Sequence, residues 1–171
     1  MNGFILVNKE SGVTSNSIVQ QIKKTIKAKK VGHLGTLDPL ASGLLILAVN
    51  RATKFSSYFL ESDKTYDVQF ELGTSTDTED STGNIIYQSN RLPKKSEVKK
   101  ILDNLIGDSM QIPPFFSALK HKGKPLYKYA RDGIKIEKAA RKIFIKNINN
   151  ISIKLPKVSF DINCSKGTYI R

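Results

Sequence analysis

The chain has 171 residues, of which 39% are hydrophobic and 25% charged, which is a globular composition that permits one domain with a real core. It contains no apolar run of transmembrane length. One cysteine excludes an intramolecular disulfide, and with only two histidines we expect no metal site. The formal charge is +13, and the excess of basic over acidic residues lies after residue 90. This asymmetry favours a polyanionic partner, first nucleic acid and second an anionic membrane surface. The alternative is a solvated lysine-rich surface.

Apolar spacing predicts the elements before residue 50. Residues 4–7 form a short apolar run, typical of a strand, which leads into a turn containing Lys9 and Glu10. From Ser15 onward apolar residues recur at helical spacing, so we expect an amphipathic helix whose late lysines interact favourably with the negative end of its dipole. The apolar run 44–49 predicts a fully buried strand.

A single carboxylate, Asp38, lies in the glycine-rich loop 32–43 (GHLGTLDPLASG), just before this buried strand. Because Asp38 precedes Pro39, we expect it in extended geometry as the N-cap of a short helical turn. Capping alone would explain the carboxylate. The glycines around it and His33 instead indicate tight turns or the close approach of another group to the backbone, which raises the odds of a functional loop.

Helices and strands are also expected in the middle of the chain. Residues 63–72 alternate with period two, which places Tyr66 on the apolar face of a strand, either as a core residue or as a stacking aromatic. The polar stretch 73–84 indicates a solvated loop rather than a divalent-ion loop. Further strands are expected at 85–88, 141–155 and 158–164, and helices at 51–60 and at 96–106 between a Ser96 cap and Gly107.

The segment 117–142 is strongly basic. It carries 9 lysines and arginines against 2 acidic residues, with tyrosines interleaved. Basic and aromatic side chains in a segment punctuated by proline and glycine fit a groove for folded RNA, with lysines on phosphates and rings against bases or sugars.

Several separated strings resemble motifs of the bacterial tRNA pseudouridine synthase B family, in family order. They are residues 32–43, the Asp-Lys-x-Tyr string ending at Tyr66, the Pro-x-x-Ser-Ala-x-Lys and Tyr-x-x-Ala-Arg-x-Gly strings at 114–133, and Gly-Thr-Tyr-Ile-Arg at 167–171. The resemblance implies an α/β (α+β) pseudouridine synthase fold, with a mixed, mostly antiparallel central sheet, flanking helices and an RNA-gripping thumb at about 117–142. The chain departs from the family at Glu10, where a proline is usual.

The resemblance also implies roles for single residues. Asp38 would be the essential catalytic carboxylate, Arg171 would pair with it, and Tyr66 would lie against the target uracil. Tyr169 would contact the base, and His33 would fill the space that the flipped base vacates. The residues expected to bind RNA are Lys9, Lys120, Lys122, Lys124, Tyr127, Lys128 and Arg131.

The implied reaction is isomerisation of uridine to pseudouridine at position 55 in the T-loop of tRNA, by base flipping, aspartate-dependent glycosidic bond cleavage and rejoining through C5. It needs no cofactor and leaves open whether Asp38 is a nucleophile or acts on a glycal-type route. We expect a cytoplasmic monomer whose partner is the T-arm stem-loop.

The resemblance covers only part of a family member. Members continue beyond Arg171 with the rest of the catalytic domain and usually a PUA domain, so residues 1–171 are expected to be an incomplete catalytic domain. The alternative is a non-catalytic RNA-binding module or an inactive fragment. We expect a poor catalyst, because Arg171 at the end of the chain would fray.

Overall fold

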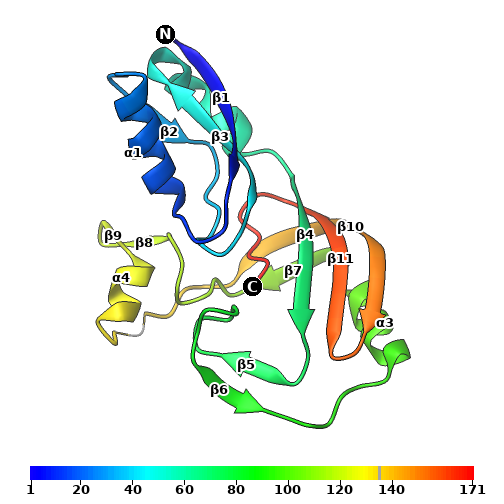
Figure 1. Ribbon diagram of the computed structural model, residues 1–171. Helices are drawn as coiled ribbons and strands as arrows, with labels where there is room; N and C mark the ends of the chain where they lie inside the picture. The colour runs from blue at the N-terminus through cyan, green and yellow to red at the C-terminus, as the bar shows by residue number, and fades with distance from the viewer. Residues whose placement is uncertain (135) are drawn as a thin grey trace. The chain divides into compact units, whose positions relative to one another are not determined.

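The computed structural model describes residues 1–134 and 136–171, and the chain divides into two compact units, Met1–Ser62 and Asp63–Arg171. Each unit mixes helices with antiparallel strands, as Figure 1 shows, which confirms the predicted α/β class. Within the described ranges, no helix is long and apolar enough to cross a membrane. That both units belong to one catalytic domain stays a prediction.

The first unit is a small sheet with helices. Its strands are ordered β1-β3-β2, and both neighbouring pairs are antiparallel. In chain order its elements are β1 (Gly3–Lys9), α1 (Ser15–Thr25), β2 (Val31–His33), β3 (Gly43–Val49), the 3-10 helix η1 (Asn50–Phe55) and α2 (Ser56–Leu60).

The central strand β3 is buried unevenly. On the face that α1 covers, Leu45 and Leu47 pack against Val19. On the other face Leu44 is 63% exposed, and Leu6 of β1, which lies opposite Ile46, is 69% exposed. The prediction that 44–49 is fully buried is therefore wrong at its first residue, because no helix of this unit covers that end of the sheet.

Helix α1 is shorter than its apolar spacing predicts. The hydroxyl of Thr14 accepts a hydrogen bond from the Ser17 N–H at 3.0 Å and so caps its first turn. The helix ends before Lys27, whose φ of 50° lies in the left-handed region. Lys23 and Lys24 occupy the last turn, as the dipole argument expects, whereas the lysines at 29 and 30 lie outside the helix.

The second unit is built on a four-stranded antiparallel sheet with the order β4-β11-β10-β7. Two short hairpins, β5-β6 and β8-β9, complete its strands. In chain order its elements are β4 (Lys64–Glu71), β5 (Thr74–Thr76), β6 (Ile85–Gln88), α3 (Lys95–Asn104), β7 (Gly107–Gln111), β8 (Lys120–His121), β9 (Lys124–Pro125), α4 (Leu126–Arg131), β10 (Arg141–Lys154) and β11 (Lys157–Cys164).

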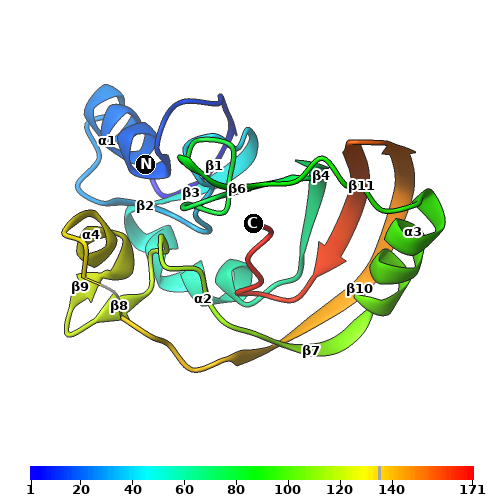
Figure 2. The ribbon, with the colours of Figure 1, turned by 90° about the horizontal axis from the view of Figure 1, so that it is seen from below.

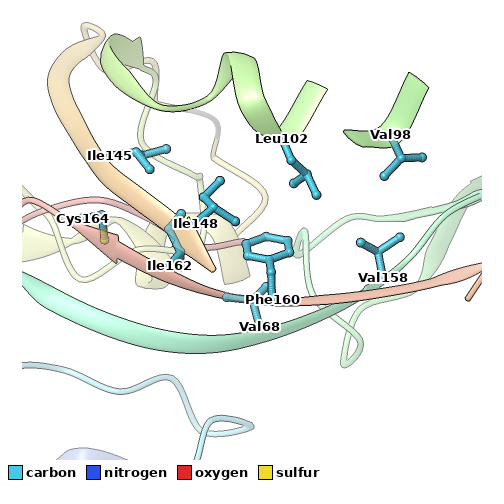
Figure 3. Close-up of a cluster of buried hydrophobic side chains, with 9 residues drawn as sticks. All are labelled: Val68, Val98, Leu102, Ile145, Ile148, Val158, Phe160, Ile162 and Cys164. Carbon is cyan, nitrogen blue, oxygen red and sulfur yellow. The ribbon is translucent and has the colours of Figure 1, made fainter. Parts of the chain in front are cut away.

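Alternation along β11 builds the core of this unit. Its even-numbered residues from Val158 to Cys164 are buried on one face, as their spacing predicts, and Figure 3 shows them beneath α3. Val98 and Leu102 of α3 pack against them. The residues of this cluster are Val68, Val98, Leu102, Ile145, Ile148, Val158, Phe160, Ile162 and Cys164.

Helix α3 lies along β10, as Figure 2 shows. It starts at Lys95, one residue before the predicted start at 96, and its cap residue is Lys94, two residues before the predicted cap at Ser96. The reason is that Glu97 accepts a hydrogen bond from the Lys94 N–H at 2.6 Å, so that Lys94 becomes the cap residue. Between β7 and β10 the chain forms the small β8-β9 hairpin and α4.

Candidate active site and RNA-binding segment

Asp38 lies in the loop between β2 and β3 and opens a β-turn. Its carbonyl accepts a hydrogen bond from the Ala41 N–H at 3.0 Å, with Pro39 at the second position of the turn. No helix begins between Asp38 and the start of β3 at Gly43, so the prediction that Asp38 caps a helical turn is wrong. The carbonyls that would continue a helix are used elsewhere: Pro39 accepts from Gly12, and Leu40 accepts from Ser11.

The segment between β1 and α1 holds this loop on both sides of Asp38. Before Asp38, the Ser15 hydroxyl donates to the Leu37 carbonyl at 2.9 Å and accepts from the Leu37 N–H at 3.0 Å. After Asp38, the Gly12 N–H donates to Pro39 at 2.8 Å. These hydrogen bonds fix the backbone on both sides of Asp38 and so restrict where its carboxylate can lie.

Lys9 supports the same loop from inside. Its side chain is fully buried, and its ammonium donates to the carbonyls of Glu10, Val13 and Pro39 at 2.9, 2.8 and 3.2 Å. Burial lowers the pKa of Lys9, and the nearby Asp38 carboxylate opposes that shift. Three carbonyls use all three donors of an ammonium, which conflicts with the predicted role of Lys9 as a ligand for RNA phosphate.

The turn at Glu10 is stiffened without the proline that is usual in the family. The Glu10 carbonyl accepts from Lys9, and the next residues tie the turn to the Asp38 loop. Hydrogen bonds therefore take the place of the fixed φ that a proline would supply.

His33 ends β2, where it faces Leu47 of β3 in the antiparallel register. It is half-buried, and burial lowers the pKa of its imidazole. The ring is therefore neutral at neutral pH and can occupy an apolar space, as filling the place of a flipped base would require.

In the second unit, Arg171 is bound to a loop that the sequence analysis assigned to solvent. Its guanidinium donates to the Asp80 carboxylate at 3.1 Å and to the Thr78 carbonyl at 3.2 Å. The side chains of Arg171 and Asp80 are only 12% and 11% exposed. The prediction of a solvated loop at 73–84 is therefore wrong at Asp80, and the expectation that Arg171 frays does not match its anchored side chain.

The Asp80 carboxylate is held by several donors. One of its oxygens accepts from the Thr78 hydroxyl at 2.9 Å and from the N–H and hydroxyl of Thr82 at 2.9 and 2.6 Å. Burial opposes ionisation, but the hydrogen bonds from Thr82 and Thr78, with the charge of Arg171, outweigh it and lower the pKa of Asp80. Asp80 is thus a fixed anion that orients a guanidinium.

The segment that contains Tyr169 is clamped to β7. The side-chain amide of Gln111 accepts from the Tyr169 N–H at 2.9 Å and donates to the Tyr169 carbonyl at 2.8 Å. Tyr66 of β4 lies opposite Ile162 of β11, and its partly buried side chain packs against the core cluster. Its predicted place on the apolar face is confirmed, and its contact with a base stays a prediction.

The thumb segment, residues 117–142, folds back on itself at its base. Leu126 is buried, and its N–H donates to the Leu119 carbonyl at 2.7 Å. The Tyr127 N–H donates to the Ser117 carbonyl at 3.0 Å. Gly123 follows Lys122 at the hairpin tip, and both have positive φ, which suits the glycine.

The cations predicted to bind RNA differ in how available they are. Lys120, Lys122 and Lys128 are exposed. Lys124 is half-buried and pairs with Asp132 at 2.6 Å, and the Arg131 guanidinium lies 5.6 Å from the centre of the Tyr127 ring.

A family model described as TruB family pseudouridylate synthase (N terminal domain) matches residues 23–170. This chain belongs to the TruB family. The matched range contains His33, Asp38, Tyr66 and the thumb segment, and it ends one residue before Arg171.

Relatives in the TruB family cover the whole chain. A protein of Shewanella denitrificans named tRNA pseudouridine synthase B is 44% identical over 171 residues, which are 100% of this chain and 54% of the relative. The protein of the same name from Psychromonas ingrahamii is 47% identical, again over 100% of this chain and 55% of the relative. The chain thus spans about half the length of these relatives.

Solved structures share the fold. The crystal structure of a Cbf5-Nop10-Gar1 complex contains a chain that matches with a TM-score of 0.70 and 27% identity, over 99% of this chain and 41% of that one. A structure of an H/ACA RNP bound to a substrate RNA containing 2'-deoxyuridine matches at a TM-score of 0.68 and 24% identity, over 99% of this chain and 39% of that one.

The predicted site residues fall into two groups. His33 and Asp38 lie in the first unit, and Tyr66, Tyr169 and Arg171 lie in the second. The pair expected between Asp38 and Arg171 would join the units, and it stays a prediction.

Sequence reasoning missed Asp80 in this TruB chain. The available signal was the run of threonines at positions 76, 78 and 82 around the aspartate, because such hydroxyls commonly bond to a nearby carboxylate.

Proposed function

We propose that this chain carries the catalytic centre of a tRNA pseudouridine synthase that acts on the uridine at position 55 of the T-loop. The observation that carries the proposal is Asp38, the one carboxylate of the loop 32–43, fixed by Ser15, Gly12 and Lys9. Relatives named tRNA pseudouridine synthase B at 44% and 47% identity over the whole chain support the same activity. Since those relatives are about twice as long, full activity is proposed for the chain together with the remaining length.

The reaction breaks the N1–C1′ bond of uridine, turns the uracil and forms a C5–C1′ bond. C5 then loses its proton and N1 gains one, so that the product is an isomer and no oxidant or reductant is consumed. Asp38 would act at the sugar, either as a nucleophile at C1′ or as a base on a glycal-type route. Both routes need an ionised carboxylate in a fixed position.

Arg171 would pair with the Asp38 carboxylate and hold it in place. A guanidinium presents a fixed fork of N–H donors that matches the two oxygens of a carboxylate. Asp80 supports this role, because it holds the Arg171 guanidinium at 3.1 Å and thereby fixes the direction of its remaining donors.

Aromatic residues would receive the flipped base. Tyr66, which packs against the core cluster from β4, would stack on the uracil, and Tyr169 would contact the base from the segment that Gln111 clamps. His33 would fill the space left in the T-loop and offset part of the cost of flipping.

The thumb segment would grip the T-arm of tRNA. Its exposed lysines, Lys120, Lys122 and Lys128, would neutralise phosphates, and Tyr127 would lie against a base or sugar. We propose that the protein works as a monomer in the cytoplasm, where unmodified tRNA is available.

The test is a turnover assay on an unmodified T-arm stem-loop, with pseudouridine detected by base-specific chemical labelling. The chain extended by the remaining length of a curated relative should form pseudouridine at position 55, and the Asp38→Asn variant should form none. A stem-loop with cytidine at position 55 is the matched control substrate. Tight binding of the stem-loop without turnover by the extended chain would instead identify an RNA-binding module.

A further inference from the structure

An acidic residue lies in the middle of the basic thumb segment. Residues 117–142 hold 9 lysines and arginines but only two acids, Asp132 and Glu137. On a surface that grips phosphates, each carboxylate should weaken binding by repulsion. The presence of Asp132 in this segment therefore needs a physical explanation, which its contacts provide.

Asp132 follows α4 directly and accepts a hydrogen bond from Lys124 of β9 at 2.6 Å. The same Lys124 ammonium lies 4.7 Å from the centre of the Tyr129 ring, a distance typical of a cation–π contact. One lysine thus connects the end of α4 with a ring on the same helix.

Tyr129 in turn contacts His121 of β8. Its hydroxyl donates to the His121 carbonyl at 3.2 Å, and the two rings meet edge to face with centres 5.9 Å apart. Asp132, Lys124, Tyr129 and His121 therefore form one chain of contacts, the thumb brace, that ties α4 to both strands of the hairpin.

We propose that Asp132 and Lys124 are positioning residues of the thumb, and that Lys124 acts through this brace and not through a phosphate. The inference rests on the proposed function, because it assigns how the RNA-gripping segment keeps its shape. With the hairpin and α4 held together, Lys120, Lys122 and Lys128 are presented to the RNA from a preformed support, and less ordering entropy is lost on binding.

The direction in which Asp132→Asn changes the affinity for a T-arm stem-loop distinguishes the brace from a simple effect of surface charge. Asp132→Asn and Glu137→Gln both remove one negative charge from the same segment, and Glu137 makes no ion pair with the residues that the structure describes. Charge alone predicts tighter binding of a T-arm stem-loop for both variants. The brace predicts that Asp132→Asn binds about three- to tenfold more weakly while Glu137→Gln binds as tightly as the unsubstituted chain or slightly more tightly.

The salt dependence of binding tests the role of Lys124 separately. Lys124→Gln should weaken binding without changing the slope of log K against log salt, whereas Lys122→Gln should lower that slope by up to about 1. Lys124→Arg should restore affinity, because it keeps both the ion pair and the contact with the ring. The Lys124→Gln, Asp132→Asn double variant should be no weaker than either single variant, since both single changes break the same brace.

Thermal unfolding of each variant shows whether the rest of the chain stays folded. If Asp132→Asn lowers the melting temperature of the whole chain, Lys124→Arg and the slope comparison still decide the question. Tight T-arm binding that Asp132→Asn strengthens or leaves unchanged would overturn the brace alone. Absence of both T-arm binding and turnover by the extended chain would overturn the proposed function and the brace with it.

Discussion

Asp38 and Asp80 are both loop aspartates, yet the structure gives them different surroundings. Asp80 is largely buried, and its carboxylate is held by Thr78, Thr82 and Arg171. A carboxylate locked as an anion in this way suits the orientation of a cation, not the transfer of a proton. The loop of Asp38 is fixed through backbone atoms, by Gly12 at the Pro39 carbonyl and by Ser15 at Leu37, and its catalytic role stays a proposal.

Substitution of Asp38 by asparagine should abolish product formation. The change removes the charge at the reacting carbon but little volume, so binding of the T-arm should stay within about tenfold, or roughly 1.4 kcal/mol. Turnover is measured on the extended chain and binding by titration of the stem-loop. Turnover close to that of the unsubstituted protein would remove Asp38 from the mechanism.

Asp80→Asn should destabilise the second unit. Replacing a buried carboxylate bonded to Arg171 and to threonine donors should cost about 1.5–3 kcal/mol of unfolding free energy at neutral pH. Asp77→Asn is the matched control, because Asp77 lies in the same loop but bonds to Asn84. Urea unfolding of the three chains gives the comparison, and equal losses for both variants would contradict the role of the Asp80–Arg171 pair.

The loss of unfolding free energy caused by Asp80→Asn should become smaller in acid. The pKa of Asp80 is lower in the folded chain than its ordinary value of 3.8, so ionisation of Asp80 stabilises the fold above that pH. This contribution disappears as the pH falls through the lowered pKa of the folded state. The difference in unfolding free energy between Asp80→Asn and the unsubstituted chain should therefore be full near pH 6 and shrink below about pH 4. A difference that stays constant to pH 3 would show that charge is not its cause.

At the scale of elements, the segment between β1 and α1 determines where the Asp38 loop lies. Ser15→Ala removes both hydrogen bonds to Leu37 and should lower kcat by roughly 10- to 100-fold, because a small displacement of a catalytic group is costly. Affinity for the stem-loop should not change. Ser17→Ala is the matched control, since the Ser17 hydroxyl donates to Thr14 and does not contact the loop. Equal kcat values for the two variants would show that the loop keeps its place without Ser15.

The thumb lysines should act as phosphate ligands as a group. Neutralising the exposed Lys120, Lys122 and Lys128 together should lower the slope of log K against log salt by up to about 2–3, if all three meet phosphates. A triple substitution on α3, at Lys95, Lys99 and Lys100, changes the net charge equally and serves as the control. The same loss of slope in both triple variants would mean that net charge, and not the thumb, binds the RNA.

Sequence alone predicted the elements whose pattern is periodic. The alternation of β11 and the apolar face of α3 are repeated over several residues, so the core they form could be read from spacing. Loop contacts have no such period. The burial of Lys9 among three carbonyls and the capture of Arg171 by Asp80 depend on where distant backbone segments meet, which spacing does not encode.

At the scale of the whole molecule, apolar side chains remain exposed in each unit. Leu6 and Leu44 are 69% and 63% exposed in the first unit, and Ile86 and Tyr87 are 67% and 63% exposed in the second. Burying one such side chain fully contributes about 1.5–3 kcal/mol. The curated relatives are about twice as long as this chain. We expect residues from that remaining length to pack over some of these exposed side chains.

The chain extended by the remaining length of a curated relative should therefore melt at least about 5 °C higher than the 171-residue chain, a shift that about 2 kcal/mol of burial would produce. It should also bind less of a dye that reports exposed apolar surface and turn over the T-arm stem-loop faster, because its site would be better supported. A matched extension of the same length with a flexible glycine-serine sequence controls for length alone. If the glycine-serine extension raised the melting temperature and the turnover rate as much as the extension from the relative, burial of these apolar side chains would not be the cause of either increase.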